Sequence, residues 1–158
     1  MNVPLYEKLW MGASAFLIVA FLITIAVGVA GSALQPPSHV ETIDPTAVEQ
    51  DPRFAQPGVT VHERGVTVVV VGSMYAFTPN EIRVPANRPV TFRLTSRDVT
   101  HGFQIVGTNG NTMVVPGYVS QFTTTFREPG EYLIVCNEYC GIGHHMMHAV
   151  INVEAGSP

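Results

Sequence analysis

Charged side chains are scarce in this sequence. Asp, Glu, Lys and Arg make up only 13% of its 158 residues, and only eight residues are Lys or Arg. A formal net charge of −4 leaves no basic footprint for a phosphate backbone, which argues against nucleic acid as a partner. The mildly acidic balance instead favours a basic protein partner, because complementary charges steer protein encounter.

One long segment lacks charge altogether. No charged residue lies between Lys8 and Glu41, and Trp10–Ala30 is almost wholly apolar. About 20 such residues, at 1.5 Å rise each, cross a bilayer core of roughly 30 Å. We therefore expect residues 1–34 to be a membrane anchor with one N-terminal transmembrane helix, its N-terminus inside and the rest of the chain outside.

A cleaved signal peptide is the alternative for this segment. Small residues that could form a cleavage site follow it, at Ala30–Ala33. However, the apolar core of a signal peptide spans only about 7–15 residues and follows a positively charged region. Here the apolar run is longer and only Lys8 precedes it. A retained single-pass anchor is the better interpretation.

An amphipathic helical period is lacking in the rest of the chain. Residues 35–58 are rich in proline and other turn formers, which predicts an extended linker. Short segments with strand character then follow. Val66–Val71 is a continuous β-branched run typical of a strand buried on both faces, whereas 90–95 and 122–126 alternate apolar and polar residues. Because turn signals separate them, these segments predict an all-β sandwich over residues 59–158.

Cysteine occurs only twice, and both cysteines lie in one short stretch. Cys136–Met147 reads CNEYCGIGHHMM, a C-x3-C-x3-H-x2-M spacing that is dense in potential metal ligands. The stretch lies between two predicted strands, so it is a loop on a rigid scaffold, where ligands are commonly found. Gly141 and Gly143 allow its backbone to turn tightly around one point.

The donor types in this loop favour copper. Thiolate and thioether select copper(I) or zinc, but structural zinc sites do not use methionine, so Met147 favours copper. A mononuclear blue-copper site uses one cysteine, whereas two thiolates, from Cys136 and Cys140, can bridge two copper ions. A second histidine is then needed beside His144, and His101 at the end of the predicted strand 90–96 is the best candidate.

Two alternatives remain open for these residues. Cys136 and Cys140 could form a disulfide in an oxidising compartment, although the adjacent histidine and methionine argue against it. Met146 is a rival to Met147 as a copper ligand, because the two are neighbours in the loop. The other histidines of the loop are interpreted as bystanders that pack or are solvated.

Two longer stretches resemble a known family. FTPNEIRVPANRPVTFRLTSRDVTHGF (residues 77–103) and PGYVSQFTTTFREPGEYLIVCNEYCGIGH (residues 116–144) are similar to subunit II of haem-copper cytochrome c oxidases, the subunit with the dinuclear copper A centre. The resemblance covers roughly residues 64–154. The single anchor helix is similar to the short subunit II of the B-family oxidases. The family implies a cupredoxin fold, a Greek-key β-sandwich.

The resemblance also implies a ligand set and an electron input surface. The implied copper ligands are Cys136 and Cys140 as bridges, His101 with Met147 on one ion, and His144 with the backbone carbonyl of Glu138 on the other. Glu138 also matches a position whose side chain, in many members, reaches a magnesium ion at the interface with subunit I. Many members receive electrons through a tryptophan-rich patch, but the only tryptophan here is Trp10. Met74, Tyr75 and Phe77 occupy the corresponding region and are the predicted input surface.

The function that the resemblance implies is electron transfer within a terminal cytochrome c oxidase. The chain would accept electrons from cytochrome c, or another small soluble donor, at copper A and pass them to the haem of subunit I. Its implied location is a prokaryotic inner membrane, with the copper domain on the periplasmic or extracellular side of the lipid bilayer. The alternatives are a copper A subunit of a nitric oxide reductase, a membrane-anchored copper chaperone, and a quinol-oxidase subunit that keeps the fold without copper.

Overall fold

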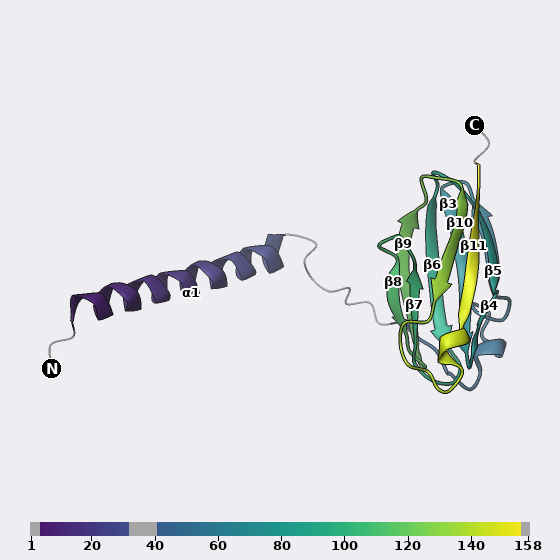
Figure 1. Cartoon of the computed structure of the whole chain (residues 1–158), viewed down its shortest axis with the longest axis horizontal. Coiled ribbons are helices and arrows are strands. Elements are labelled where there is room, and N and C mark those ends of the chain that lie inside the picture. Colours follow the sequence, from purple (N-terminus) through teal and green to yellow (C-terminus); the bar gives the residue numbers. More distant parts are fainter. Residues whose placement is uncertain (1–3, 32–40, 156–158) are drawn as a thin grey trace. The chain divides into compact units, whose positions relative to one another are not determined.

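The computed structural model describes residues 4–31 and 41–155, which belong to two separate units of the chain (Figure 1). In its described residues, the first unit is the helix α1 (Leu5–Gly31). Its segment Leu5–Gly28 is long and apolar enough to cross a membrane, and none of its most apolar window is buried inside the protein. A helix that is apolar on all sides and not covered by protein needs an apolar solvent. The length, composition and exposure of α1 therefore fit a membrane anchor.

The second unit is a sandwich of two β-sheets. One sheet has the strand order β1-β9-β6-β3-β2, with β4 paired to β3, and the other has the order β5-β11-β10-β7-β8. Paired strands are antiparallel, apart from the parallel pairs β3 with β6 and β5 with β11. The strands are β1 (Glu41–Thr42), β2 (Gly58–His62), β3 (Gly65–Ser73), β4 (Ala76–Thr78), β5 (Glu81–Pro85), β6 (Pro89–Ser96), β7 (His101–Ile105), β8 (Asn111–Val114), β9 (Tyr118–Thr125), β10 (Gly130–Val135) and β11 (His148–Glu154), with the 3-10 turns η1 (Val48–Gln50) and η2 (His144–Met146). The predicted all-β sandwich is confirmed.

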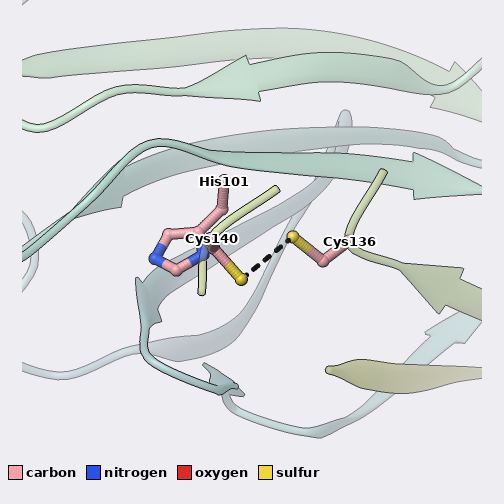
Figure 2. A group of neighbouring side chains, drawn as sticks. All are labelled: His101, Cys136 and Cys140. Carbon is pink, nitrogen blue, oxygen red and sulfur yellow. Dashed lines mark hydrogen bonds between the residues drawn. The ribbon is translucent and has the colours of Figure 1, made fainter. Parts of the chain in front are cut away.

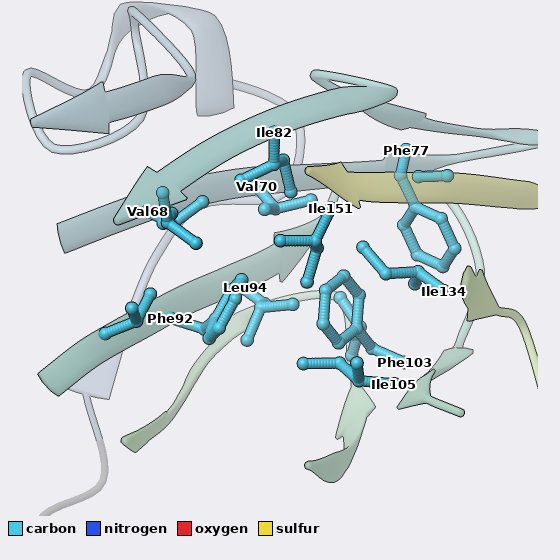
Figure 3. Packing of buried hydrophobic residues seen from close by; sticks show 14 of the residues in the cluster. Val68, Val70, Phe77, Ile82, Phe92, Leu94, Phe103, Ile105, Ile134 and Ile151 are labelled. Carbon is cyan, nitrogen blue, oxygen red and sulfur yellow. The ribbon is translucent and has the colours of Figure 1, made fainter. Parts of the chain in front are cut away.

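The main core lies between the two sheets (Figure 3). One sheet contributes the fully buried side chains of Val68, Val70 and Leu94, from β3 and β6. The other sheet contributes those of Ile134 and Ile151, from β10 and β11. Since side chains alternate across a strand, the apolar–polar alternation of the sequence puts one row of each strand into this core.

The opposite face of β3 is also covered, by residues that the sequence placed in a linker. We call residues 41–57 the strap. Its side chains Ile43, Val48 and Phe54 are buried, and they pack with Val71 and the partly buried Val69 in a second apolar cluster. The predicted burial of β3 on both faces is therefore confirmed. The folded unit, however, begins at β1 rather than at residue 59, and residues 35–40 lie outside the described part of the chain.

Three strand ends meet at one end of the sandwich. β7 begins at His101, β10 ends directly before Cys136, and β11 begins directly after Met147. β10 pairs antiparallel with both β7 and β11, so these ends lie side by side. The connection from β10 to β11 is therefore placed next to His101.

Candidate metal centre

Both ends of the loop Cys136–Met147, here called the ligand loop, are fixed to the sheet. The Cys136 N–H donates to the Met147 carbonyl at 3.2 Å, continuing the pairing of β10 with β11. Gly141 has a φ of 129°, a backbone conformation that side chains other than glycine rarely adopt. The loop can therefore fold back so that residues near its start and its end face one another.

The ligand loop approaches β7 closely at a glycine. A Cβ atom on Gly102 would lie 1.9 Å from Oδ1 of Asn137 and 2.8 Å from the backbone nitrogen of Glu138. Any side chain at this position would push the loop away. Gly102 is thus what lets the cysteine loop lie against the strand that begins with His101.

The His101 ring is fully buried at the end of the core. Its Cδ2 atom would lie 3.0 Å from a Cβ on Gly72, and the Phe77 ring meets it edge-on with centroids 6.5 Å apart. Its Nε2 lies 2.9 Å from Oδ1 of Asp98, whereas its Nδ1 is buried without a hydrogen-bond partner among the described residues. A buried imidazole nitrogen without a partner is costly unless something binds it.

The free nitrogen of His101 lies among sulfur atoms. The ligand atoms of His101, Cys136 and Cys140 all lie within 4.8 Å of one another (Figure 2). The two cysteines are free and buried, and their sulfurs are 3.8 Å apart. The sulfur of Cys140 also lies 3.7 Å from Nδ1 of His144 and 3.7 Å from Sδ of Met147. All the side chains predicted as copper ligands are therefore grouped around the sulfur of Cys140.

Electrostatics at this point suit a metal rather than bare thiolates. Burial, together with the neighbouring Cys136 thiol, raises the pKa of Cys140 to about 11, so the metal-free thiol is protonated at neutral pH. Burial alone would raise the pKa of Asp98, but hydrogen bonds from Met74, His101 and Val99 outweigh it and hold that pKa below its usual value. Soft sulfur and imidazole donors, with a buried nitrogen left unpaired, fit copper by chemistry and by position.

Known proteins share both the sequence and the fold. The family described as "Cytochrome C oxidase subunit II, periplasmic domain" matches residues 53–154. A cytochrome c oxidase subunit 2 from Thermus thermophilus is 40% identical over 154 residues, which cover 94% of this chain and 92% of the relative. A chain of a haem-copper terminal oxidase dimer superposes with a TM-score of 0.65 at 31% identity, covering 94% of this chain and 99% of that chain. The periplasmic domain of subunit II (CoxB) from Bradyrhizobium japonicum shares the fold, with a TM-score of 0.55 at 20% identity over 61% of this chain and 88% of that domain.

The chain belongs to the cytochrome c oxidase subunit II family. It is an electron-transfer subunit of a cytochrome c oxidase complex, with a cupredoxin-like sandwich and a copper-A-like site of His, Cys and Met side chains. The long apolar helix and the family's periplasmic domain together make it a membrane-anchored protein.

The structure of this subunit II separates the two methionine candidates. Met147 is 2% exposed with its sulfur at Cys140, whereas the side chain of Met146 is 63% exposed. The Glu138 backbone carbonyl accepts from the Cys136 thiol at 3.2 Å, and the Glu138 side chain is exposed. The weak ligands predicted for the two ions, Met147 and the Glu138 carbonyl, both lie at the centre.

The predicted electron input surface needs one correction. Met74 is 50% exposed and Tyr75 is 38% exposed, but Phe77 is 1% exposed and lies in the core. β4 is only three residues long, too short for its pattern to show which side faces inward, and Phe77 is its one inward residue. Tyr75 instead lies on the ligand loop, since a Cβ on Gly143 would be 2.5 Å from its ring.

Two residues of the site were not singled out from the sequence. Asp98 orients His101, and its position three residues before that histidine is the signal that could have found it. Gly102 directly follows His101, but the close approach of Asn137 that requires a glycine there is a long-range contact. Sequence spacing alone does not reveal such a contact.

Proposed function

We propose that this subunit II holds a dinuclear copper A centre, through which it accepts electrons from cytochrome c and passes them to the haem of subunit I. The proposed ligands are His101, Cys136, Cys140, His144, Met147 and the Glu138 carbonyl. The thiolates of Cys136 and Cys140 would hold two copper ions together, and the bound centre would supply a carrier for one electron. The observation that carries this proposal is that two free thiols lie beside the buried His101 ring, whose Nδ1 is unpaired, and that a thioether and a second imidazole meet the sulfur of Cys140.

The residues of the chain would hold this centre rigidly and shield most of it from water, although His144 is only half-buried. His101, Cys136, Cys140 and Met147 are all at most 7% exposed. Because the ligand loop is fixed to β-strands at both ends, its donors move little when charge changes. A dry and rigid surrounding shell limits the response of solvent and protein to an added electron. These are the properties that rapid one-electron transfer requires.

We also propose that the donor docks at the exposed Met74 and Tyr75. Tyr75 touches the ligand loop through Gly143, so a protein seated there would be close to the centre. The side chains that the donor would meet are mostly apolar, so the encounter should depend only weakly on salt. Tyr75→Ala should slow the reduction of the centre by cytochrome c. Val61→Ala is a suitable control, since Val61 is 59% exposed and pairs with Val66 at the other end of β3. Equal rates in Tyr75→Ala and Val61→Ala would refute this docking position.

The assembly and location follow from the same proposal. The copper domain lies on the periplasmic or extracellular side of a prokaryotic inner membrane, next to subunit I. A magnesium ion at that interface stays a prediction that rests on the exposed carboxylate of Glu138.

The test uses the purified oxidase complex. When it is mixed with reduced cytochrome c under anaerobic conditions, absorbance at the haem bands follows the arrival of electrons in subunit I. Cys136→Ser should abolish rapid haem reduction, because it removes one bridging thiolate. Unchanged haem reduction in an assembled Cys136→Ser complex would contradict the proposed route. Slow exchange of bound copper against a chelator would separate an electron carrier from a copper chaperone, which must release its metal.

A further inference from the structure

The two carboxylate oxygens of Asp98 contact different parts of the site. Oδ1 lies 2.9 Å from Nε2 of His101 and accepts from the backbone N–H of Val99 at 2.6 Å. The Ser96 hydroxyl lies 3.2 Å from the same oxygen. Oδ2 accepts from the backbone N–H of Met74 at 2.6 Å. The backbone N–H groups of Val99 and Met74 can only donate, so each carboxylate oxygen accepts a hydrogen bond.

The contact with Oδ1 determines which nitrogen of His101 carries the proton. A carboxylate can only accept, so the proton is on Nε2 and the lone pair is on Nδ1. Because Nε2 is engaged by Asp98, Nδ1, which is buried without a partner, is the nitrogen left to face the cysteine sulfurs. The ring cannot turn to another position easily, because Gly72 and Phe77 confine it.

The contact with Oδ2 reaches the protein surface. Met74 lies in the turn between β3 and β4 and is 50% exposed, and the following Tyr75 lies on the ligand loop. The turn and the buried ring are thus attached to the two different oxygens of the same carboxylate. The Asp98 side chain is 24% exposed, so these hydrogen bonds are partly shielded from water.

We propose that Asp98 is a positioning residue of the electron-transfer centre. It fixes His101 in the Nε2–H tautomer, which leaves Nδ1 free to hold a metal, and it fixes the Met74–Tyr75 turn through the Met74 N–H. A carboxylate on the far nitrogen raises the basicity of an imidazole ligand and stabilises the oxidised metal, so Asp98 lowers the reduction potential of the centre. This inference rests on the proposed copper centre for its last part, whereas the tautomer and the turn are properties of the metal-free chain.

Asp98→Asn tests these contacts most directly, because an amide has the shape of a carboxylate but replaces one oxygen by an NH₂ group. That group must face either Met74 N–H or the donors at Oδ1, so one of the two contacts is lost. Glu131→Gln is the matched control. This substitution also replaces a carboxylate by an amide, but at an exposed position of β10, close to the start of that strand and away from the ligand loop.

The first measurement is NMR on the full-length, metal-free chain in detergent, with ¹⁵N-labelled histidine and amide hydrogen exchange. In the wild type and in Glu131→Gln, His101 should be the Nε2–H tautomer and the Met74 amide should exchange slowly. In Asp98→Asn, His101 should populate both tautomers, or Met74 should exchange about tenfold faster or more, as expected when a hydrogen bond to a charged group is lost.

The second measurement uses the copper-loaded full-length chain. Asp98→Asn should bind copper about 10- to 100-fold more weakly and should have a higher reduction potential than the wild type and Glu131→Gln. A side chain with only a local structural role would lower the stability without changing the potential or the tautomer.

Two results would overturn the inference. One is a wild-type His101 with its proton on Nδ1, which decides the matter even if Asp98→Asn does not fold. The other is an Asp98→Asn chain that matches Glu131→Gln in tautomer, Met74 exchange and potential. Failure of the wild type to bind copper would instead refute the proposed function, while the NMR result on the metal-free chain would still decide the role of Asp98.

Discussion

The polar side chains of the strap have hydrogen-bond and ion-pair partners within the chain, whereas those of the metal centre largely lack them. In the strap, Arg53 donates to Glu41 and Asp51, and Arg93 of β6 donates to Glu41, so three charged side chains of the strap share one network with the sheet. At the metal centre, the Nδ1 of His101 has no partner, and the cysteine sulfurs have mainly one another and other soft donors. Besides His101 Nδ1, Arg93 Nε is the buried side-chain nitrogen or oxygen found without a hydrogen-bond partner among the described residues.

This difference separates a region built for stability from one built for a ligand. Paired charges above an apolar cluster hold the strap on β3 without help from any other molecule. The centre instead gathers donors that satisfy one another poorly, and a metal ion would satisfy them together. Metal binding should therefore add stability to this end of the sandwich, because it stabilises the folded chain over the unfolded one.

The largest effect that tests this comparison is the loss of a bridging thiol. Cys136→Ser and Cys140→Ser should each abolish the dinuclear centre, since one bridge cannot hold both ions. The metal-free stability should change little, because serine has nearly the shape of cysteine. Copper analysis and thermal unfolding with and without copper measure both quantities. A Cys140→Ser chain that still carries two coppers would show that the thiolates are not what holds both ions.

A substitution in the strap should have the reverse effect, lowering stability while copper binding is retained. Phe54 is 1% exposed beneath Arg93, so Phe54→Ala should lower the free energy of unfolding by about 3–5 kcal/mol through lost burial and the cavity left behind. The copper content of the folded fraction should stay that of the wild type. Denaturant unfolding and copper analysis provide the check, and a Phe54→Ala chain that folds but has lost its copper would show that the two regions are not independent.

Removing the weak ligand should have a subtler effect. Met147→Leu keeps the volume of the side chain at the buried position and deletes only the thioether. Both coppers should stay bound and the reduction potential should shift, because an axial thioether tunes the potential rather than holding the ion. Redox titration measures this. Complete loss of copper from Met147→Leu would give Met147 a different role.

The smallest effect concerns the charges of the strap. The hydrogen bond from Arg93, partly opposed by burial, lowers the pKa of Glu41, so ionised Glu41 stabilises the fold. A lowered pKa contributes stability above the unfolded value near 4.3, and this contribution is lost as pH falls through the folded pKa. Glu41→Gln should cost about 1 kcal/mol or less at neutral pH and should flatten the acid limb of the stability curve. A variant with the wild-type acid limb would show that another carboxylate carries it.

The sequence predicted the sandwich and the ligand loop because both have local signals. Strands appear as alternation or as β-branched runs, and the cysteines, His144 and Met147 come from one continuous stretch. The strap has no such signal: Ile43, Val48 and Phe54 follow no period, and they become core only through contacts with β3 that are distant in sequence. Turn-rich composition indicated correctly that the segment is irregular, but irregular structure can still be packed.

The same limit applies within the site. His101 is predictable from the family motif that contains it and from its place at a strand end. The approach of Asn137 to Gly102 and the burial of Phe77 depend on how the two sheets are stacked. Periodicity within one strand does not contain that information.

Copper stoichiometry combined with electron paramagnetic resonance on the full-length, copper-loaded chain tests the proposed centre most directly. Two coppers per chain, with hyperfine structure shared equally over both nuclei, is the predicted result, because the free sulfurs of Cys136 and Cys140 lie 3.8 Å apart and would hold both ions together. One copper with a single-nucleus signal would contradict the dinuclear centre. A chain that binds no copper and keeps a Cys136–Cys140 disulfide after reduction and reloading would contradict the metal site itself.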